Sequence, residues 1–326
     1  MQMKLAILGT GKIVQEFLPM IREIENVELV AILSTPRSLE KAKELQATYH
    51  IEKVYTDYAT LLADKAIDTV YVALPNHLHY SYTKEALLQG KHVICEKPFT
   101  LRLAELQELV ELAKAKQLIL IEAITNQYLN NYLQIKEDIQ KIGKVKIVEC
   151  NYSQYSSRYD AFKKGNVLPA FDPKKGGGAL MDINIYNIHF VVGLFGEPKQ
   201  VDYLANVQRA VDTSGVLVLD YVDFKVVCIG AKDSSAEIRS VIQGTDGSIE
   251  VIGATNEIPV YTLNTKEGQE TKNVNLANHR MHQEFVKFNE VIAQNNLAFA
   301  FDKLAHSLMV MEIVEQALAS AAIKLG

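Results

Sequence analysis

The fold is decided by residues 4–24, KLAILGTGKIVQEFLPMIREI. An apolar run leads into Gly9-Thr10-Gly11, and apolar residues at helical spacing follow, which predicts a buried strand, a tight turn and a helix. The first glycine permits the turn, and the second lets the backbone approach a pyrophosphate at the helix start. Val14 replaces the third glycine of the GxGxxG pattern, so a purely structural turn remains the alternative to dinucleotide binding.

Two patterns of secondary structure follow one another along the chain. Strand and helix patterns alternate over residues 1–123, which predicts a parallel sheet covered by helices on both faces. Over residues 124–326, long strand-like runs are separated by turn signals such as Thr245-Asp246-Gly247, which predicts an antiparallel sheet. The 326 residues suit two domains, so we predict an α/β protein with a dinucleotide-binding domain over residues 1–123 and a second domain over residues 124–326, for which a role in binding substrate and in dimerisation is implied only by the resemblance described below.

Composition limits the function classes. The formal charge of −5 without a basic stripe argues against a nucleic-acid partner, and no apolar run is long enough to predict a membrane span. The three cysteines, Cys95, Cys150 and Cys228, are widely spaced and show no CxxC pattern, which predicts neither disulfides nor a metal site. The N-terminus lacks signal-peptide features, so we expect a cytoplasmic protein whose cysteines are core residues.

The segment after the second predicted strand bears on the choice of cofactor. An acidic residue at this position binds the ribose 2′-hydroxyl of NAD, but the chain has Ser34-Thr35-Pro36-Arg37-Ser38 there. Arg37 is suited to pair with a 2′-phosphate, which favours NADP over NAD. The alternative for Arg37 is a solvated loop charge.

Polar residues follow three other predicted strands. Pro75, Asn76 and His79 follow one strand, Glu96 and Lys97 end the next, and a further strand ends at Glu122-Ala123. Carboxyl ends of parallel strands meet at the edge where ligands bind, so these residues are expected beside the glycine loop. The predicted cofactor-binding residues are Gly9, Gly11, Lys12, Ile13, Ser34, Arg37, Pro75, Asn76, His79, Glu96 and Lys97.

Three segments together resemble the Gfo/Idh/MocA oxidoreductases: GTGKI (9–13), LPNHLHYSYTKEALLQGKHVICEKPFT (74–100) and GGGALMDINIYNIHFVVGLFG (176–196). The resemblance implies a doubly wound Rossmann domain followed by an α/β domain with a large, mostly antiparallel open sheet. It also implies NAD(P)-dependent hydride transfer between nicotinamide and a sugar, polyol or related hydroxy compound. A homodimer or dimer of dimers through the second-domain sheet is common in this family.

The resemblance carries over to single residues. The family's catalytic lysine falls on Lys97, its asparagine near the nicotinamide on Asn76, and the histidine that follows on His79. The first acid of its second-domain motif falls on Asp182. Tyr186 matches a subgroup that includes glucose–fructose oxidoreductase and dihydrodiol and xylose dehydrogenases and that largely prefers NADP. Asn184 and His189 depart from the family pattern, where a glycine and an acid are expected. In that subgroup an arginine and a proline are also expected where this chain has Gln127 and Asn130, so the substrate is not copied from any member.

Each catalytic candidate has an expected role. Tyr186 is expected to exchange a proton with the substrate hydroxyl, while Lys97 supplies positive charge and binds the substrate. Asp182 is expected to bind substrate hydroxyls and to hold the lysine. His189, at i+3 from Tyr186 if residues 179–195 are helical, is the alternative base. A core tyrosine and a structural histidine are the alternatives, so the choice between Tyr186 and His189 stays open.

Two other functions remain as alternatives. One branch of the family hydrolyses glycosides in a redox-neutral cycle that uses a tightly held NAD. Because the second-domain motif is incomplete, a non-catalytic dinucleotide sensor is the other alternative, although Lys97, Asp182 and Tyr186 argue against it.

Overall fold

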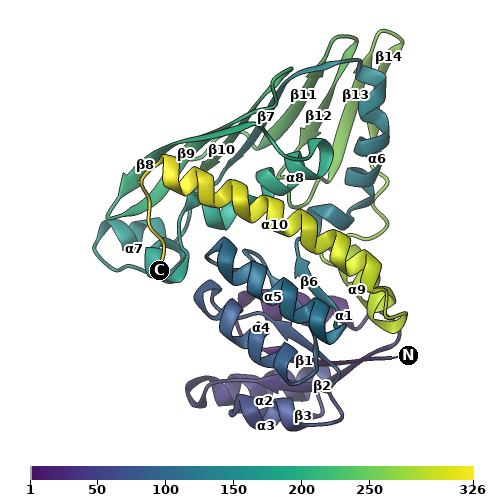
Figure 1. Ribbon diagram of the computed structural model, residues 1–326, viewed down its shortest axis with the longest axis vertical. Coiled ribbons are helices and arrows are strands. Elements are labelled where there is room, and N and C mark those ends of the chain that lie inside the picture. The colour runs from purple at the N-terminus through teal and green to yellow at the C-terminus, as the bar shows by residue number, and fades with distance from the viewer. Residues whose placement is uncertain (1) are drawn as a thin grey trace. The chain divides into compact units, whose positions relative to one another are not determined.

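Six parallel strands form the centre of unit 1, the first of two units in this computed structural model, which describes residues 2–326 (Figure 1). The strands are β1 (Met3–Leu8), β2 (Val27–Leu33), β3 (Lys53–Tyr55), β4 (Thr69–Val72), β5 (His92–Glu96) and β6 (Leu120–Ala123). Their order in the sheet is β3-β2-β1-β4-β5-β6, which confirms the predicted doubly wound parallel sheet. The order reverses between β1 and β4, where such sheets bind ligands.

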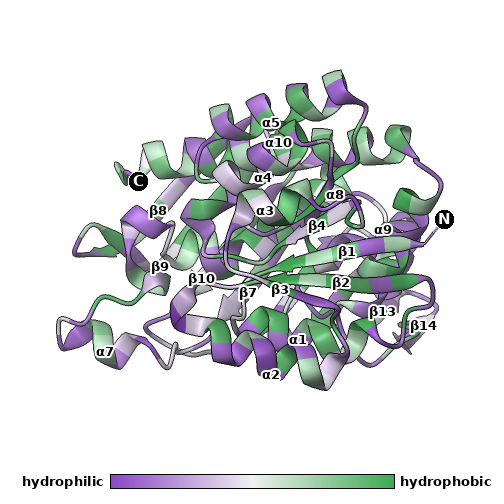
Figure 2. Cartoon of the chain, turned by 90° about the horizontal axis from the view of Figure 1, so that it is seen from below, coloured by the Kyte–Doolittle hydropathy of each residue, from purple (hydrophilic) through white to green (hydrophobic). Residues whose placement is uncertain are grey.

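Helices cover both faces of this sheet. They are α1 (Lys12–Ile21), α2 (Leu39–Tyr49), α3 (Tyr58–Ala63), α4 (His79–Leu88) and α5 (Leu103–Lys116). Figure 2 shows α4 and α5 on one side of β1 and β2, with α1 and α2 on the other side. Because both faces are covered, strands such as β1 and β4 are almost continuously apolar and buried.

Each unit is built from two segments of the chain. Unit 1 combines the residues up to Ala123 with Met281–Leu308, and unit 2 combines Ile124–Arg280 with Met309–Gly326. Helix α9 (His282–Ala293) therefore packs with unit 1, and α10 (Leu297–Ser320) begins in unit 1 and ends in unit 2.

Aromatic packing explains why α9 belongs to unit 1. The ring of Phe285 lies 4.7 Å from that of Phe17 on α1 and 5.2 Å from that of Tyr71 on β4. All three side chains are fully buried. Such contacts join segments far apart in the sequence and leave no local pattern. Residues 281–308, which the sequence pattern places in the second domain (124–326), therefore pack with unit 1.

An eight-stranded, mostly antiparallel sheet forms the centre of unit 2, as predicted. Its strands are β7 (Val145–Ser153), β8 (Gln200–Gln208), β9 (Val211–Asp220), β10 (Lys225–Ala231), β11 (Arg239–Gly244), β12 (Gly247–Ile252), β13 (Val260–Thr265) and β14 (Gly268–Lys272). The order is β14-β13-β12-β11-β7-β10-β9-β8, and only β7 and β10 pair in parallel among the described strands of this sheet.

The two faces of this sheet differ in burial. Tyr203, Leu217 and Cys228 pair across three strands and are all buried. The next row across the sheet includes Leu204 and Ile252, which are 70% and 50% exposed. One face of the sheet therefore belongs to the core of unit 2, and the other is an open face with apolar side chains.

Helices of unit 2 pack against its sheet. They are α6 (Asn130–Asp138), α7 (Tyr159–Lys163) and α8 (Ile185–Phe195), and a π-helical turn, Leu180–Asn184, leads into α8. This turn contacts β10, and α8 contacts β7. The three cysteines are free and buried, which confirms the prediction that they are core residues.

Among the described residues, one helical stretch, Pro173–Phe195, is long and apolar enough to cross a membrane. However, 72% of its most apolar window is buried within the protein. Burial of this kind is typical of a core helix.

Candidate functional site

The loop after β1 forms a cradle at the N-terminus of α1. Gly9 has φ +106°, and a Cβ there would lie 2.8 Å from the carbonyl oxygen of Ala73, so this position requires glycine. A Cβ on Gly11 would meet nothing within 4 Å, so space is open at the helix start. Val14 is fully buried in place of the third glycine. The loop and the amide end of α1 therefore fit a dinucleotide pyrophosphate, beside Lys12 and Ile13 at the start of the helix.

Hydroxyl groups gather after β2, where the ribose is expected. The Ser34 hydroxyl oxygen is buried and has no hydrogen-bond partner among the described residues. The hydroxyl oxygens of Thr35 and Ser38 lie 3.0 Å apart, and Arg37 is exposed between them in the turn Pro36–Ser38. An exposed guanidinium and three hydroxyls fit a ribose 2′-phosphate.

Lys97 lies at the edge of the sheet, directly after β5. The Tyr71 hydroxyl donates to the carboxylate of Glu96, the last residue of the strand. Cys95 is fully buried, and the partly exposed Lys97 follows Glu96 with a cis peptide bond to Pro98. Lys97 thus lies at the carboxyl end of β5, as predicted.

His79 connects two loops at this edge. Its Nδ1 lies 2.8 Å from the carbonyl oxygen of Pro98, and its Nε2 lies 2.8 Å from that of Leu74. Burial lowers the pKa of His79, and the two carbonyl contacts oppose this shift. The ring therefore fixes the segment after β4, which carries Pro75 and Asn76, against the segment that follows Lys97.

Asp182 and Tyr186 lie at the start of α8 in unit 2. The Asp182 carboxylate is 37% exposed and pairs with the Lys232 ammonium at 2.6 Å. Tyr186 keeps 7% exposure, and its ring lies 6.3 Å from that of Tyr152. His189 is completely buried. Of the two candidates for proton exchange, only Tyr186 retains exposed surface in unit 2.

Asp212 of β9 fixes the start of the π-helical turn. Its carboxylate accepts hydrogen bonds from the Leu180 amide at 2.6 Å and from the Tyr203 hydroxyl at 2.7 Å. Gly178 has φ +125°, and a Cβ there would collide with the same carboxylate. Burial raises the pKa of Asp212 to about 6. Neither Asp212 nor Lys232 was singled out from the sequence.

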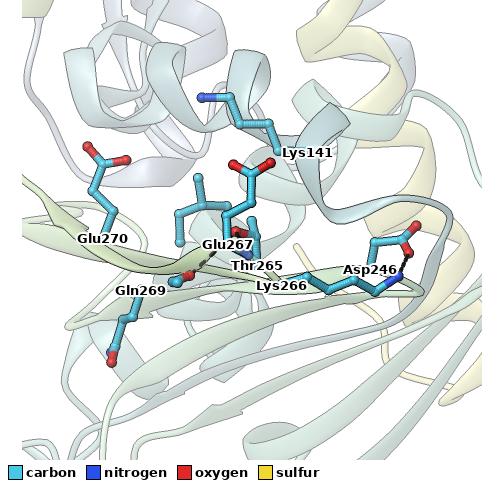
Figure 3. A pocket seen from close by; sticks show the side chains of 9 residues that line it. Lys141, Asp246, Thr265, Lys266, Glu267, Gln269 and Glu270 are labelled. Atoms are coloured by element: carbon cyan, nitrogen blue, oxygen red, sulfur yellow. Dashed lines mark hydrogen bonds and ion pairs between the residues drawn. The ribbon is translucent and has the colours of Figure 1, made fainter.

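A separate pocket lies among charged hairpin residues of unit 2 (Figure 3). Lys266 pairs there with Asp246 at 2.6 Å and is 78% exposed, as expected for a solvated surface pair. The residues that line this pocket include none of the predicted site residues. In the part of the chain that the structure describes, no group of metal-ligating side chains occurs.

Each of the two units contains a segment that matches a model of a known protein family. Residues 3–124 match the description "Oxidoreductase family, NAD-binding Rossmann fold", and residues 132–250 match "GFO/IDH/MocA C-terminal domain". The chain belongs to the Gfo/Idh/MocA family. It is therefore an NAD(P)-binding oxidoreductase that acts on hydroxyl groups, which confirms the family, activity and cofactor class predicted from the sequence.

Named Gfo/Idh/MocA relatives cover almost the whole chain. Scyllo-inositol 2-dehydrogenase (NADP(+)) IolU of Bacillus subtilis is 36% identical over 96% of this chain and 95% of its own length. Trans-1,2-dihydrobenzene-1,2-diol dehydrogenase of Xenopus tropicalis is 27% identical over 98% of both chains. The 3-ketoreductase KijD10 of Actinomadura kijaniata, solved with NADP and TDP-benzene, has the same fold, with a TM-score of 0.87, 19% identity and 98% of both chains covered.

Asn184, a departure from the Gfo/Idh/MocA motif, anchors the π-helical turn before α8 to the sheet. Its amide donates to the carbonyl oxygen of Cys228 at 3.1 Å and its amide oxygen accepts from Asn187 at 2.8 Å. The Thr255 hydroxyl donates to Asn187 at 2.8 Å. A Cβ on Gly230 would lie 2.7 Å from the Asn184 Cβ, so the close packing of Asn184 on β10 requires a glycine there.

Gln127, another departure from the subgroup pattern, also holds this helix. Its amide donates to the carbonyl oxygen of His189 at 2.8 Å, and the neighbouring Asn126 donates to that of Tyr186 at 2.9 Å. Both amide side chains are buried. They support the orientation of α8 rather than binding a ligand directly.

Proposed function

We propose that the protein is an NADP-dependent dehydrogenase that interconverts a secondary alcohol and a ketone on a cyclic polyol or sugar. The observation that supports this proposal is the exposure at the start of α8, where Asp182 is 37% exposed and Tyr186 keeps 7% exposure while His189 has none. A carboxylate and a phenol suit a hydroxylated substrate. The similarity to a scyllo-inositol dehydrogenase supports an inositol as the first substrate to test.

Each residue has one task in the proposed reaction. A nicotinamide held by unit 1 would supply the acceptor or donor for the hydride that leaves or joins the substrate carbon. Tyr186 takes the proton from the substrate hydroxyl as the ketone forms and returns it in the reverse direction. Lys97 stabilises the negative charge that develops on the substrate oxygen. Asp182 accepts hydrogen bonds from neighbouring substrate hydroxyls and so orients the ring.

The proposed cofactor site uses the residues predicted from the sequence. Unit 1 would hold the dinucleotide through Gly9, Gly11, Lys12 and Ile13 at the pyrophosphate. Ser34 and Arg37 would bind the 2′-phosphate, which is why NADP is preferred over NAD. The remaining predicted contacts lie after β4 and β5: Pro75, Asn76, Glu96 and Lys97, with Asn76 near the nicotinamide. His79 was also predicted to contact the cofactor, but its two ring nitrogens meet carbonyl oxygens, so we propose that it holds these segments in place.

A substrate panel tests this function. The purified protein is assayed with scyllo-inositol, myo-inositol, D-xylose, D-glucose and a trans-dihydrodiol, each with NADP and with NAD. We expect reduced nicotinamide to form with at least one inositol and NADP. Tight NADP binding without turnover of any compound would favour a sensor, and phenol release from aryl glycosides without net cofactor reduction would favour a hydrolase.

We also propose a homodimer, or a dimer of dimers, in the cytoplasm. The open face of the unit 2 sheet supports pairing, because it exposes Leu204 and Ile252 in one row across the sheet. Exposed apolar patches of this kind mark interaction surfaces.

A further inference from the structure

Lys232 is a lysine enclosed in unit 2 directly after β10. Its side chain is 3% exposed, and its ammonium lies 2.6 Å from an oxygen of Asp182 and 2.6 Å from the carbonyl oxygen of Ala170. It also lies 4.5 Å from the centre of the Phe171 ring. A buried ammonium is costly unless it is paired and hydrogen-bonded, and these three contacts meet that need.

The two side chains of the Asp182–Lys232 pair differ in exposure. Asp182 is 37% exposed while its lysine partner is enclosed. In the pair of Asp138 with Lys272 the arrangement is reversed, with a fully buried carboxylate and a lysine that is 14% exposed. A pair that only stabilises the fold gains nothing from presenting its carboxylate to the surface. The enclosed Lys232 instead supports a carboxylate that remains accessible to a bound molecule.

The surroundings of Lys232 are rigid. Phe171 belongs to a small buried cluster with Tyr159, Phe162 and Val211. The Lys232 main chain is held on both sides, since its amide donates to Thr213 at 2.8 Å and its carbonyl oxygen accepts from Ser156 at 2.9 Å. Because the lysine is held in place, its ion pair with Asp182 fixes the orientation of the carboxylate.

Other charged groups near this pair are also constrained. Asp212 is attracted to Lys232 and accepts hydrogen bonds from Leu180 and Tyr203. Asp233, the next residue, accepts hydrogen bonds from the hydroxyls of Thr213 and Ser214 at 2.7 and 2.9 Å. Lys232 is thus a cation in direct contact with the Asp182 carboxylate.

We propose that Lys232 is a positioning residue that holds the Asp182 carboxylate ionised and in the orientation that accepts hydrogen bonds from substrate hydroxyls. This inference rests on the proposed function, because it assigns Asp182 to substrate binding. Lys232 does not touch the substrate, since it is enclosed by Ala170, Phe171 and Asp182.

A double-mutant cycle tests the proposal by activity. Lys232→Met is combined with Asp182→Asn, and kcat/KM is measured for the four proteins. We expect Lys232→Met to lower kcat/KM by about 100-fold in the wild-type background, as misplaced groups do. In the Asp182→Asn background we expect a further loss of no more than roughly 3-fold. Losses that simply multiply would show that Lys232 acts only through the fold and would overturn the proposal.

Lys91→Met is the matched control. Lys91 is another buried lysine, but its ammonium donates to the carbonyl oxygens of Asp64 and Ile67 at 3.0 and 2.7 Å, in unit 1. We expect this variant to lose thermal stability and to keep kcat/KM. If Lys91→Met lowered kcat/KM as much as Lys232→Met does, loss of a buried lysine in general would explain the effect.

A titration without turnover separates this proposal from the proposed function. Protein labelled with ¹³C at aspartate carboxyls is titrated by NMR, with Asp182→Asn used to assign the resonance. We expect Asp182 to titrate about one pH unit higher in Lys232→Met, since a neighbouring cation is lost, and unchanged in Lys91→Met. An unchanged Asp182 titration overturns the role of Lys232 even in an active enzyme. Absence of turnover in the wild type overturns the proposed function and leaves the titration to decide on Lys232.

Discussion

Exposure distinguishes Tyr186 from His189. The sequence brought both residues to one helix but could not separate them, because helical spacing places i and i+3 on neighbouring positions whichever side is buried. In the structure His189 is fully enclosed, and its main chain is held by Gln127. Tyr186 is therefore the residue that we assign to proton exchange.

Substitutions of Tyr186 and of His189 are expected to have different effects on kcat and on the melting temperature. Tyr186→Phe removes only the hydroxyl and should lower kcat by about 100-fold or more, with an unchanged melting temperature. His189→Asn should lower the melting temperature and leave kcat of the folded protein within a few-fold. A large loss of kcat in folded His189→Asn, with Tyr186→Phe fully active, would reverse the assignment.

Arg37 decides the preference for NADP in this account. Removing one charge-assisted hydrogen-bonding group should cost roughly 1.5–3 kcal/mol, so Arg37→Ala should weaken NADP binding by about 10- to 100-fold. NAD affinity should stay the same, since NAD lacks the 2′-phosphate. Dissociation constants from nicotinamide fluorescence would measure both, and an unchanged ratio would remove Arg37 from the site.

Lys232 shows what a sequence can and cannot reveal. In the segment VVCIGAKD, residues 226–233, a lysine follows an apolar strand, as it does after Glu96 in VICEKP, residues 93–98. Lys97 was identifiable because parallel strands end at a known ligand-binding edge. An antiparallel sheet has no such edge, so the same pattern at Lys232 carried no prediction.

At the scale of elements, the alternation of strands and helices predicted both sheets correctly. The π-helical turn before α8 was not predictable, because it depends on the capping of Leu180 by Asp212 from a distant strand. The docking of α9 on unit 1 depends in the same way on long-range aromatic contacts. Periodicity reports local structure, and these features are set by tertiary packing.

The end of α6 is tied to β13 and β14 by Asp138. Burial alone would raise the pKa of this carboxyl, but hydrogen bonds from Lys141, Tyr261 and Lys272 lower it to about 2. A depressed pKa contributes stability that is present above the unfolded-state value and is lost as pH falls toward 2. The contribution is about 2 kcal/mol.

Denaturant unfolding across acidic pH tests this link. The difference in unfolding free energy between wild type and Asp138→Asn should be largest at neutral pH and should shrink as pH falls from about 5 to about 2. A difference that stays constant over this range would show that the carboxylate charge does not stabilise the connection.

At the scale of the whole molecule, the open face of the unit 2 sheet is the expected dimer interface. If the proposed homodimer forms through this face, Leu204→Glu combined with Ile252→Glu should convert it to monomers, because charges would be buried at the interface. Leu276→Glu is the control, since Leu276 is 84% exposed and lies in a loop outside the sheet. Light scattering would report the masses, and a double variant that stays dimeric would place the interface elsewhere.

The proposed role of Lys97 is tested most directly by the initial rate of NADPH formation from scyllo-inositol, measured for the wild type and for Lys97→Met. Lys97 directly follows β5, and we propose it as the catalytic lysine because the sequence resemblance places the family's lysine at this position. We predict a measurable rate for the wild type and a loss of about 1,000-fold for Lys97→Met, with NADP binding retained. A Lys97→Met protein that kept the wild-type rate would show that Lys97 does not stabilise the charge on the substrate oxygen.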